Sequence, residues 1–264
     1  MTEEGDETAL AVRDAILAER GVGSQSELRR WREERFLREV QVVQSLRSKY
    51  ICEVLDYGLY QGRMFLVVEK LVGQSLAEAL NTKASQGQVL TEGQVRRIAN
   101  ELLLGLEAAA EVGLSHCNLT PNNVFLSGSG VRLLNLGVAG WEPEMINNAD
   151  YKLPVKAMPQ YMSPEQVSGR LVDPRSDIFS VGVIMYRCVS GKLPFDGPIF
   201  MNIVQALMNS PTPDLEKEAI TSVGSGFVQI VNRSLAKSPD QRYETARAMI
   251  TDLESLGGEE GKPN

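Results

Sequence analysis

The strongest constraint on the fold comes from residues 177–190, DIFSVGVIMYRCVS, which are almost entirely apolar. A helix on the surface of a protein carries apolar side chains along one stripe, whereas a helix that is apolar all round is buried. The stretch is shorter than the ~20 apolar residues of a membrane span, and no other run in the sequence reaches that length. We therefore predict a buried helix here.

The other segments place strands early in the chain and helices late. Residues 51–57 and 64–68 are strand-like and are separated by turn residues, which predicts a hairpin. Residues 10–20 fit a strand or a helix, and their alanines slightly favour the helix. Helices are predicted at residues 27–46, 76–84, 91–113, 199–209, 223–236 and 242–256. This order indicates an α+β fold with two lobes.

The composition excludes several classes of function. The 264 residues, 43% hydrophobic and 23% charged, are typical of a globular protein with a substantial core. The net charge of −7 argues against binding to nucleic acid or to an anionic membrane. The acidic N-terminus is not a signal peptide, and three scattered cysteines indicate reduced thiols, so we expect a cytoplasmic protein without membrane insertion. The single histidine, His116, excludes a multi-histidine metal site.

Two motifs follow one another in the middle of the chain. HCNLTPNNV covers residues 116–124 and LLNLGVA covers residues 133–139, with strand-like residues leading into the second motif. Together they resemble the catalytic loop and the metal-binding turn of a protein kinase, whose patterns are H-R-D-x-K-P-x-N and D-F-G. From residue 35 to residue 256 the sequence resembles a bacterial-type serine/threonine protein kinase domain.

Further motifs of this family occur in the expected order. Glu39, in RFLREV, has the position of the helix-C glutamate, and Glu69 and Leu71 lie in a segment that resembles the hinge. QYMSPEQ resembles the A-P-E segment, whose glutamate is here Glu165. KSPDQRY carries Arg242 at the position of the arginine that pairs with that glutamate, so the resemblance implies a buried ion pair that is costly to break.

The resemblance implies a protein kinase-like two-lobed fold of the α+β class. It has a truncated small N-terminal sheet lobe and a mainly helical C-terminal lobe. The expected boundaries are residues 1–72 for the N-terminal lobe, with helix C near 27–46 and the hinge near 69–73, residues 73–256 for the C-terminal lobe, and residues 257–264 for a flexible tail.

The residues that the family uses for phosphoryl transfer are replaced in this sequence. Asn118 has the position of the catalytic aspartate, and Asn135 that of the metal-binding aspartate. An asparagine cannot accept the proton of a substrate hydroxyl, and positioned base catalysis contributes ~10²–10⁴-fold in rate. Thr120 and Met158 replace the lysine and the threonine that position the substrate. Cys117 replaces the arginine that grips a phosphate on the activation loop.

The nucleotide-binding residues of the family are also incomplete. No lysine precedes Lys49, so the strand-three lysine is missing from this sequence; the segment LAVR places Arg13 at its position, where it would face Glu39. A place for Arg13 on the solvent face of a helix is an equally good interpretation. Asn123 is normal for the family's metal site, but with Asn135 it supplies no negative charge to Mg²⁺. We expect weak or absent binding of ATP and Mg²⁺, no other cofactor and no metal site.

Other family positions keep residues with structural roles. The resemblance implies that His116 and Leu136 stack in an apolar column between the lobes, with Val43 above them. Gly137 is retained beside Leu136. Asp177 resembles the buried aspartate that accepts hydrogen bonds from the backbone of the catalytic loop. His116 is therefore expected to be a packed framework residue rather than a base.

These observations favour a kinase-like domain without phosphotransfer activity, a pseudokinase rather than an enzyme, that acts in signalling as a protein-binding scaffold or allosteric regulator. The alternatives are a nucleotide-binding switch without turnover, and a weakly active serine/threonine kinase or atypical phosphotransferase that uses ATP. Residues 199–209 carry more apolar side chains than one helix face can bury against a lobe. We expect Phe200 and Met201 to bind a protein partner or to mediate self-association, with internal packing as the alternative.

Overall fold

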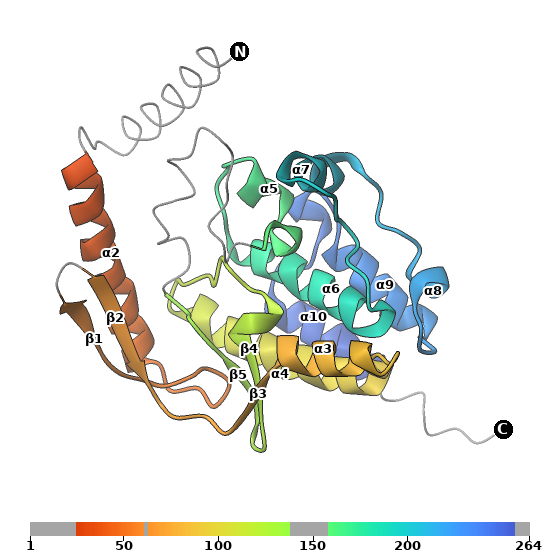
Figure 1. Ribbon diagram of the computed structural model, residues 1–264, viewed down its shortest axis with the longest axis horizontal. Coiled ribbons are helices and arrows are strands. Elements are labelled where there is room, and N and C mark those ends of the chain that lie inside the picture. The colour runs from red at the N-terminus through yellow and green to blue at the C-terminus, as the bar shows by residue number, and fades with distance from the viewer. Residues whose placement is uncertain (1–24, 61–62, 138–157, 257–264) are drawn as a thin grey trace, which may run out of the picture.

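The structure, a computed structural model, describes residues 25–60, 63–137 and 158–256. These residues form a small region of strands with one long helix, next to a larger region made mainly of helices (Figure 1). The predictions for Arg13, for residues 10–20 and for the tail at residues 257–264 lie outside the described residues. Among the described helices, none is long and apolar enough to cross a membrane.

The long helix of the small region is α2, Gln25–Ser45. It buries Phe36, Val40 and Val43, which follow one another at steps of four and three residues and therefore share one face. This apolar face packs α2 against the rest of the molecule, and the Gln44 side chain adds a hydrogen bond to the Leu55 carbonyl at 3.1 Å. The helix agrees with the prediction for residues 27–46 apart from its ends, where such boundaries commonly differ.

Helix α2 packs against a two-stranded antiparallel sheet. Its strands are β1, Val54–Tyr60, and β2, Arg63–Val68. The first strand begins at Val54 and not at residue 51 because Ile51 instead forms a parallel bridge to Leu133 of the larger region. The Cys52 N–H donates to the Leu133 carbonyl at 2.9 Å, so the residues before β1 tie the two regions together.

A second antiparallel sheet lies at the edge of the helical region, with the strand order β3-β4-β5. The strands are β3, Gly73–Ser75, β4, Val124–Ser127, and β5, Gly130–Leu133. Sequence patterns do not reveal β3, because three residues are too few to show alternation. A Cβ atom on Gly73 would lie 2.0 Å from the Leu126 carbonyl oxygen, so only glycine lets β3 approach β4 this closely.

The buried helix predicted at residues 177–190 is confirmed as α6, Pro174–Ser190. Nearly all of its residues are buried, and α4, α9 and α10 pack around it. The Asp173 side chain caps its N-terminus by accepting from the Arg175 N–H, and Gly191, at φ 69°, ends it in the left-handed conformation that glycine adopts without strain. Helix α6 is therefore the central element of the larger region.

The other helices surround α6 (Figure 1). They are α3 (Leu76–Ser85), α4 (Glu92–Glu111), α5 (Pro164–Val167), α7 (Phe200–Asn209), α8 (Leu215–Glu218), α9 (Ser225–Ser234) and α10 (Ala246–Ser255). Short 3-10 turns occupy Pro121–Asn123, Pro159–Tyr161 and Pro239–Gln241. Helix α4 lies within the predicted range 91–113 and follows the N-cap Thr91, whose hydroxyl accepts from the Gln94 N–H while the Gln94 side chain accepts from the Thr91 N–H.

Candidate active site

The loop between α4 and β4 is anchored from below by α6. The Asp177 carboxylate accepts the backbone N–H of His116 at 2.7 Å and that of Cys117 at 2.9 Å. Cys117 has a φ of 60°, a left-handed conformation that is uncommon for a residue with a side chain and needs such support. Burial raises the pKa of Asp177 to about 6, although the two backbone N–H groups oppose this shift.

His116 joins this loop to the end of β5. The Asn118 N–H donates to Nδ1 at 3.3 Å, which leaves Nε2 to donate to the Leu134 carbonyl oxygen at 2.8 Å. The ring is fully buried, and burial lowers the pKa of His116 to about 4, so the imidazole is neutral at physiological pH. Both ring nitrogens are engaged with backbone groups. The geometry therefore gives His116 a framework role and leaves no nitrogen to act as a base.

Three asparagines form a chain of hydrogen bonds across the candidate site. The Asn123 side-chain N–H donates to the Asn118 carbonyl at 2.8 Å, and the Asn135 side-chain N–H donates to Asn123 Oδ1 at 2.9 Å. Asn123 is buried, whereas Asn118 and Asn135 are exposed. Asn135 has a φ of 59°, a conformation that asparagine tolerates better than most residues. Hydrogen bonds thus link the three asparagines across the candidate site, with amides at its two exposed positions.

These side chains do not fit a Mg²⁺ site. Magnesium prefers charged oxygen ligands, and Asn123 and Asn135 supply only neutral ones. The Asn123 oxygen is also occupied by the Asn135 amide. Within residues 25–60, 63–137 and 158–256 there is no group of three or more His, Cys, Asp or Glu side chains that could hold a metal ion.

The turn after Asn135 packs against α2. Leu136 is buried, and a Cβ atom on Gly137 would lie 2.9 Å from Val43 Cγ2. Gly137 also has a φ of 75°, so both its space and its backbone require glycine. Glu39 lies at the same contact and forms an ion pair with Arg35 of its own helix at 2.5 Å. Val43 and Leu136 belong to the apolar core, and His116 is fully buried.

The hinge residues connect to the strand before them. The Glu69 N–H donates to the Glu53 carbonyl at 3.0 Å, and the Glu69 carboxylate accepts the Glu53 N–H at 3.0 Å. Leu71 is half-buried. The Glu69 side chain is therefore already used in holding the hinge.

The segment that begins at Met158 contacts the loop between α4 and β4. Met158 Sδ lies 3.8 Å from the Asn122 side-chain nitrogen, and Thr120 is buried. The Gln166 side chain donates to the Cys117 carbonyl at 2.6 Å, a contact that sequence patterns do not reveal because it joins residues far apart in the chain. Cys117, Thr120 and Met158 are thus brought together around the loop that carries Asn118.

A buried ion pair holds this segment to the end of the chain. Arg242 makes two parallel hydrogen bonds to Glu165, at 2.7 and 2.8 Å, and its remaining N–H groups donate to backbone carbonyls. The Ser176 hydroxyl also donates to Glu165. Burial opposes the ionisation of Glu165, but the hydrogen bonds and the charge of Arg242 outweigh it and lower the pKa of the carboxyl to about 2.

The predicted partner-binding residues lie at the start of α7. Met201 is 51% exposed and Phe200 is half-buried, while Ile203 and Leu207 form the buried face of the helix. The two residues therefore differ: Met201 projects into solvent, and Phe200 is shared between surface and core. Whether a protein binds here stays a prediction.

The family described as "Protein kinase domain" matches residues 16–252. The serine/threonine-protein kinase pkn2 of Myxococcus xanthus is 33% identical over 226 residues, which is 83% of this chain and 27% of that protein. The serine/threonine-protein kinase PknL of Mycobacterium tuberculosis is 32% identical over 231 residues, 87% of this chain and 56% of that protein.

Solved structures give the same fold. A mutant of the Mycobacterium tuberculosis PknI kinase domain superimposes with a TM-score of 0.67 at 22% identity, covering 86% of this chain and 79% of that chain. The kinase-like fold with a small sheet lobe and a helical C-terminal lobe is therefore confirmed. The chain spans between about a quarter and somewhat more than half of the two sequence relatives, at 27% and 56%.

The expectation that the chain is not an enzyme is wrong. The kinase family matches most of the chain, and relatives at 33% and 32% identity are named serine/threonine-protein kinases, which points to an enzyme. The expectation treated the replacement of Asn118 and Asn135 as the loss of activity. Replacement of a catalytic group lowers a rate by a finite factor, so it does not by itself decide whether a reaction occurs.

Proposed function

Because this chain belongs to the protein kinase domain family, we propose that it is a bacterial-type serine/threonine protein kinase domain that transfers phosphate slowly from ATP to a protein hydroxyl. The observation that supports the proposal is the assembled loop: Asp177 fixes its backbone from below, His116 ties it to β5, and Asn118 remains exposed at its surface. A framework of this kind holds a reacting group in place even where the group itself has changed.

The chemistry of phosphoryl transfer is compatible with an amide at this position. The transition state is loose, so positioning and electrostatic stabilisation matter more than removal of the hydroxyl proton. The Asn118 amide oxygen can accept a hydrogen bond from the substrate hydroxyl and orient it, while the proton leaves to water or to the transferred phosphoryl group. Loss of a positioned base lowers the rate by ~10²–10⁴-fold, which is why we propose slow transfer.

We further propose weak binding of the nucleotide. The Asn123–Asn135 hydrogen bond closes the position at which the family holds its metal, and neither amide carries charge. The same observation favours a second candidate function, a switch that binds the nucleotide and transmits its presence through Gly137 to α2. In both cases the affinity for Mg·ATP is expected to be low.

The experiment is transfer of radiolabelled phosphate from ATP, with Mg²⁺ or Mn²⁺, to peptides that contain serine or threonine. Wild-type protein should incorporate label above a heat-killed control, and Asn118→Ala, purified in the same way, should incorporate less. No incorporation, or equal incorporation by the two proteins, contradicts the proposal. A melting shift measured in parallel tests binding alone, since a ligand at 100 times its Kd stabilises a fold by ~2.7 kcal/mol. A shift without incorporation favours the switch.

A further inference from the structure

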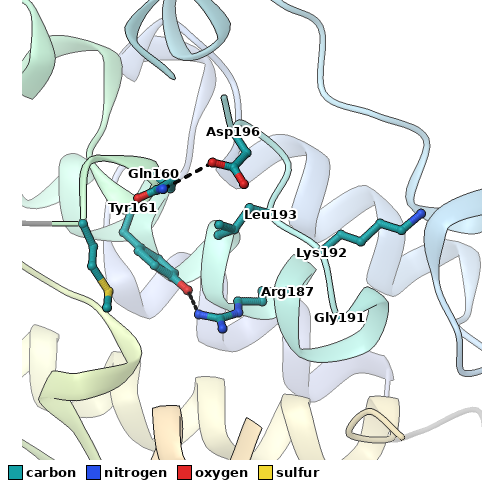
Figure 2. Close-up of a pocket in the computed structure, with 8 residues that line it drawn as sticks. Gln160, Tyr161, Arg187, Gly191, Lys192, Leu193 and Asp196 are labelled. Carbon is teal, nitrogen blue, oxygen red and sulfur yellow. Dashed lines mark hydrogen bonds between the residues drawn. The ribbon is translucent and has the colours of Figure 1, made fainter. Parts of the chain in front are cut away.

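A cavity of about 510 Å³ is lined in part by Met158, which also contacts Asn122 of the asparagine-bearing loop. Tyr161, from the turn before α5, and Arg187, near the end of α6, meet in it, and Gln160 and Asp196 face each other at another part of its wall (Figure 2). A volume of this size is typical of ligand sites. The candidate site described above does not include it.

Arg187 lies in the last turn of α6, directly after the mostly apolar residues 178–186. Its guanidinium donates to the Tyr161 hydroxyl, and among the described residues it forms no ion pair with a carboxylate. Burial raises the pKa of Tyr161 above its usual value, so the phenol stays protonated and does not neutralise the guanidinium. A half-buried arginine whose guanidinium forms no ion pair among the described residues suits a carboxylate or a phosphate.

The two other charged side chains that line the cavity, Asp196 and Lys192, have partners of their own. Asp196 Oδ1 accepts the Gln160 side-chain N–H at 3.2 Å and the Gly197 N–H at 2.9 Å. Lys192 points away from Arg187 and pairs with Glu218 at 2.6 Å (Figure 2). Arg187 is therefore the cation that an incoming anion meets in this cavity.

We infer that this cavity binds an acidic side chain of the protein substrate and that Arg187 is the specificity-determining residue. The inference rests on the proposed kinase function, because only a bound protein substrate brings such a chain to the loop. Met158 lies against both the cavity and Asn122 of that loop. An extended peptide with its hydroxyl at Asn118 can therefore continue along Met158 to the cavity.

The test measures binding and needs no ATP. The probes are three fluorescein-labelled peptides with a central threonine and either glutamate, glutamine or lysine at the flanking positions. Kd values are determined by fluorescence anisotropy at constant ionic strength. The net charge of −7 works against unspecific binding of the glutamate peptide, which makes a preference for it informative. A fourth peptide, with phosphoserine in place of glutamate, distinguishes a phosphorylated segment from a carboxylate-bearing one.

Wild-type protein should bind the glutamate peptide about tenfold more tightly than the glutamine peptide, the effect of one or two charge-assisted hydrogen bonds. Arg187→Gln should remove this ratio, Arg187→Lys should keep part of it, and Arg187→Glu should shift the preference to the lysine peptide. Lys192→Gln is the matched control and should keep the wild-type ratio. The charge reversal is a readout that a loss of folding cannot imitate.

Equal Kd values for the peptides, no binding of any of them, or an unchanged ratio in Arg187→Gln overturns the inference. These outcomes are separate from those of the phosphate-transfer assay. Binding that depends on Arg187 without label transfer keeps the docking site and contradicts the kinase proposal. Label transfer without a charge preference keeps the kinase proposal and contradicts the docking site.

Discussion

Two sets of polar side chains border the same loop, and they differ in burial and in chemistry. Below the loop, Asp177 and Glu165 are buried carboxylates, each held by several donors. At its surface, Asn118 and Asn135 are exposed amides at positions where the motif resemblance predicts aspartates. A buried carboxylate cannot be replaced without leaving its donors unsatisfied, whereas an exposed one can be replaced at little cost to folding. Folding stability thus constrains the buried carboxylates, whereas only the chemistry of the site constrains the exposed amides.

The backbone of the site follows the buried set. Cys117 and Asn135 both have left-handed conformations, at φ 60° and 59°, although neither is glycine. The Cys117 N–H is held by Asp177, and the Asn135 amide is held by Asn123. The backbone at Cys117 is therefore held by a buried carboxylate, whereas Asn135 is held by another amide.

The largest effect is expected for Arg242→Ala. The change leaves Glu165 buried without its ion-pair partner, which should lower the free energy of unfolding by ~3–5 kcal/mol. Chemical denaturation measures this directly. Arg247→Ala is the matched control, because its pair with Glu107 is more exposed, with 57% of the Arg247 side chain accessible, and should be worth ~0–1 kcal/mol. Equal, small effects of the two substitutions would contradict the assignment of Glu165 to the carboxylates that folding stability constrains.

The second prediction concerns the exposed set. Asn118→Asp should raise the rate of phosphate transfer by about 10²-fold, since it restores a base at a position whose backbone is already held. The free energy of unfolding should change by less than ~0.5 kcal/mol, because the side chain is exposed. Radiolabel incorporation and chemical denaturation of the same preparation measure the two quantities. An unchanged rate would show that the loop geometry alone does not prepare the site.

The third prediction uses the opposing titrations of Asp177 and His116. Burial raises the pKa of Asp177 to about 6, so between about pH 4 and 6 the folded state holds a proton that the unfolded state releases, and this contribution to stability falls as pH rises. Burial lowers the pKa of His116 to about 4, so over the same range the unfolded state holds the extra proton and stability rises with pH. The two contributions cancel in the wild-type protein.

Asp177→Asn removes only the contribution of Asp177 to stability, the one that falls as pH rises. Between pH 4.5 and 6 its free energy of unfolding should therefore rise more steeply with pH than that of the wild type, by up to ~1.4 kcal/mol per pH unit. Denaturation at several pH values compares the slopes, with Arg247→Ala as a control that should run parallel to the wild type. Parallel profiles for Asp177→Asn would mean that the carboxylate does not titrate in this range.

The sequence predicted those parts of the fold that depend on local patterns. Helix α6 follows from an apolar run and α4 from a capping motif with a clear apolar face, because both signals lie within one segment. Strand β3 was missed, because its three residues are ordered by pairing with β4 and not by a pattern of their own. Residues before β1 were taken for strand, since nothing local reveals the bridge from Ile51 to Leu133.

The site was predictable as a set of positions and less so as a set of contacts. The motifs placed His116 and Asn118 in one loop and Asn135 in a separate turn, but the chain of asparagine hydrogen bonds depends on how these two segments meet. The contact of Arg187 with Tyr161 joins residues 26 positions apart, and its only sequence signal was a charge within an apolar helix. The activity was misjudged because replaced residues report on rate and say little about which reaction the framework supports.

The smallest effect on folding is expected for Met201→Ser. Met201 is 51% exposed, so the free energy of unfolding should change by less than ~0.5 kcal/mol, whereas Ile203→Ser, two residues further along α7 and 5% exposed, should cost ~2–4 kcal/mol because it removes a buried side chain. Phe200→Ser should fall between them, since Phe200 is half-buried. If α7 is a face for self-association, Met201→Ser and Phe200→Ser should lower the apparent mass measured by light scattering at high protein concentration while circular dichroism stays unchanged. An unchanged mass in both variants would place the exposed part of α7 with the other solvent-facing positions, where a substitution alters neither folding nor association.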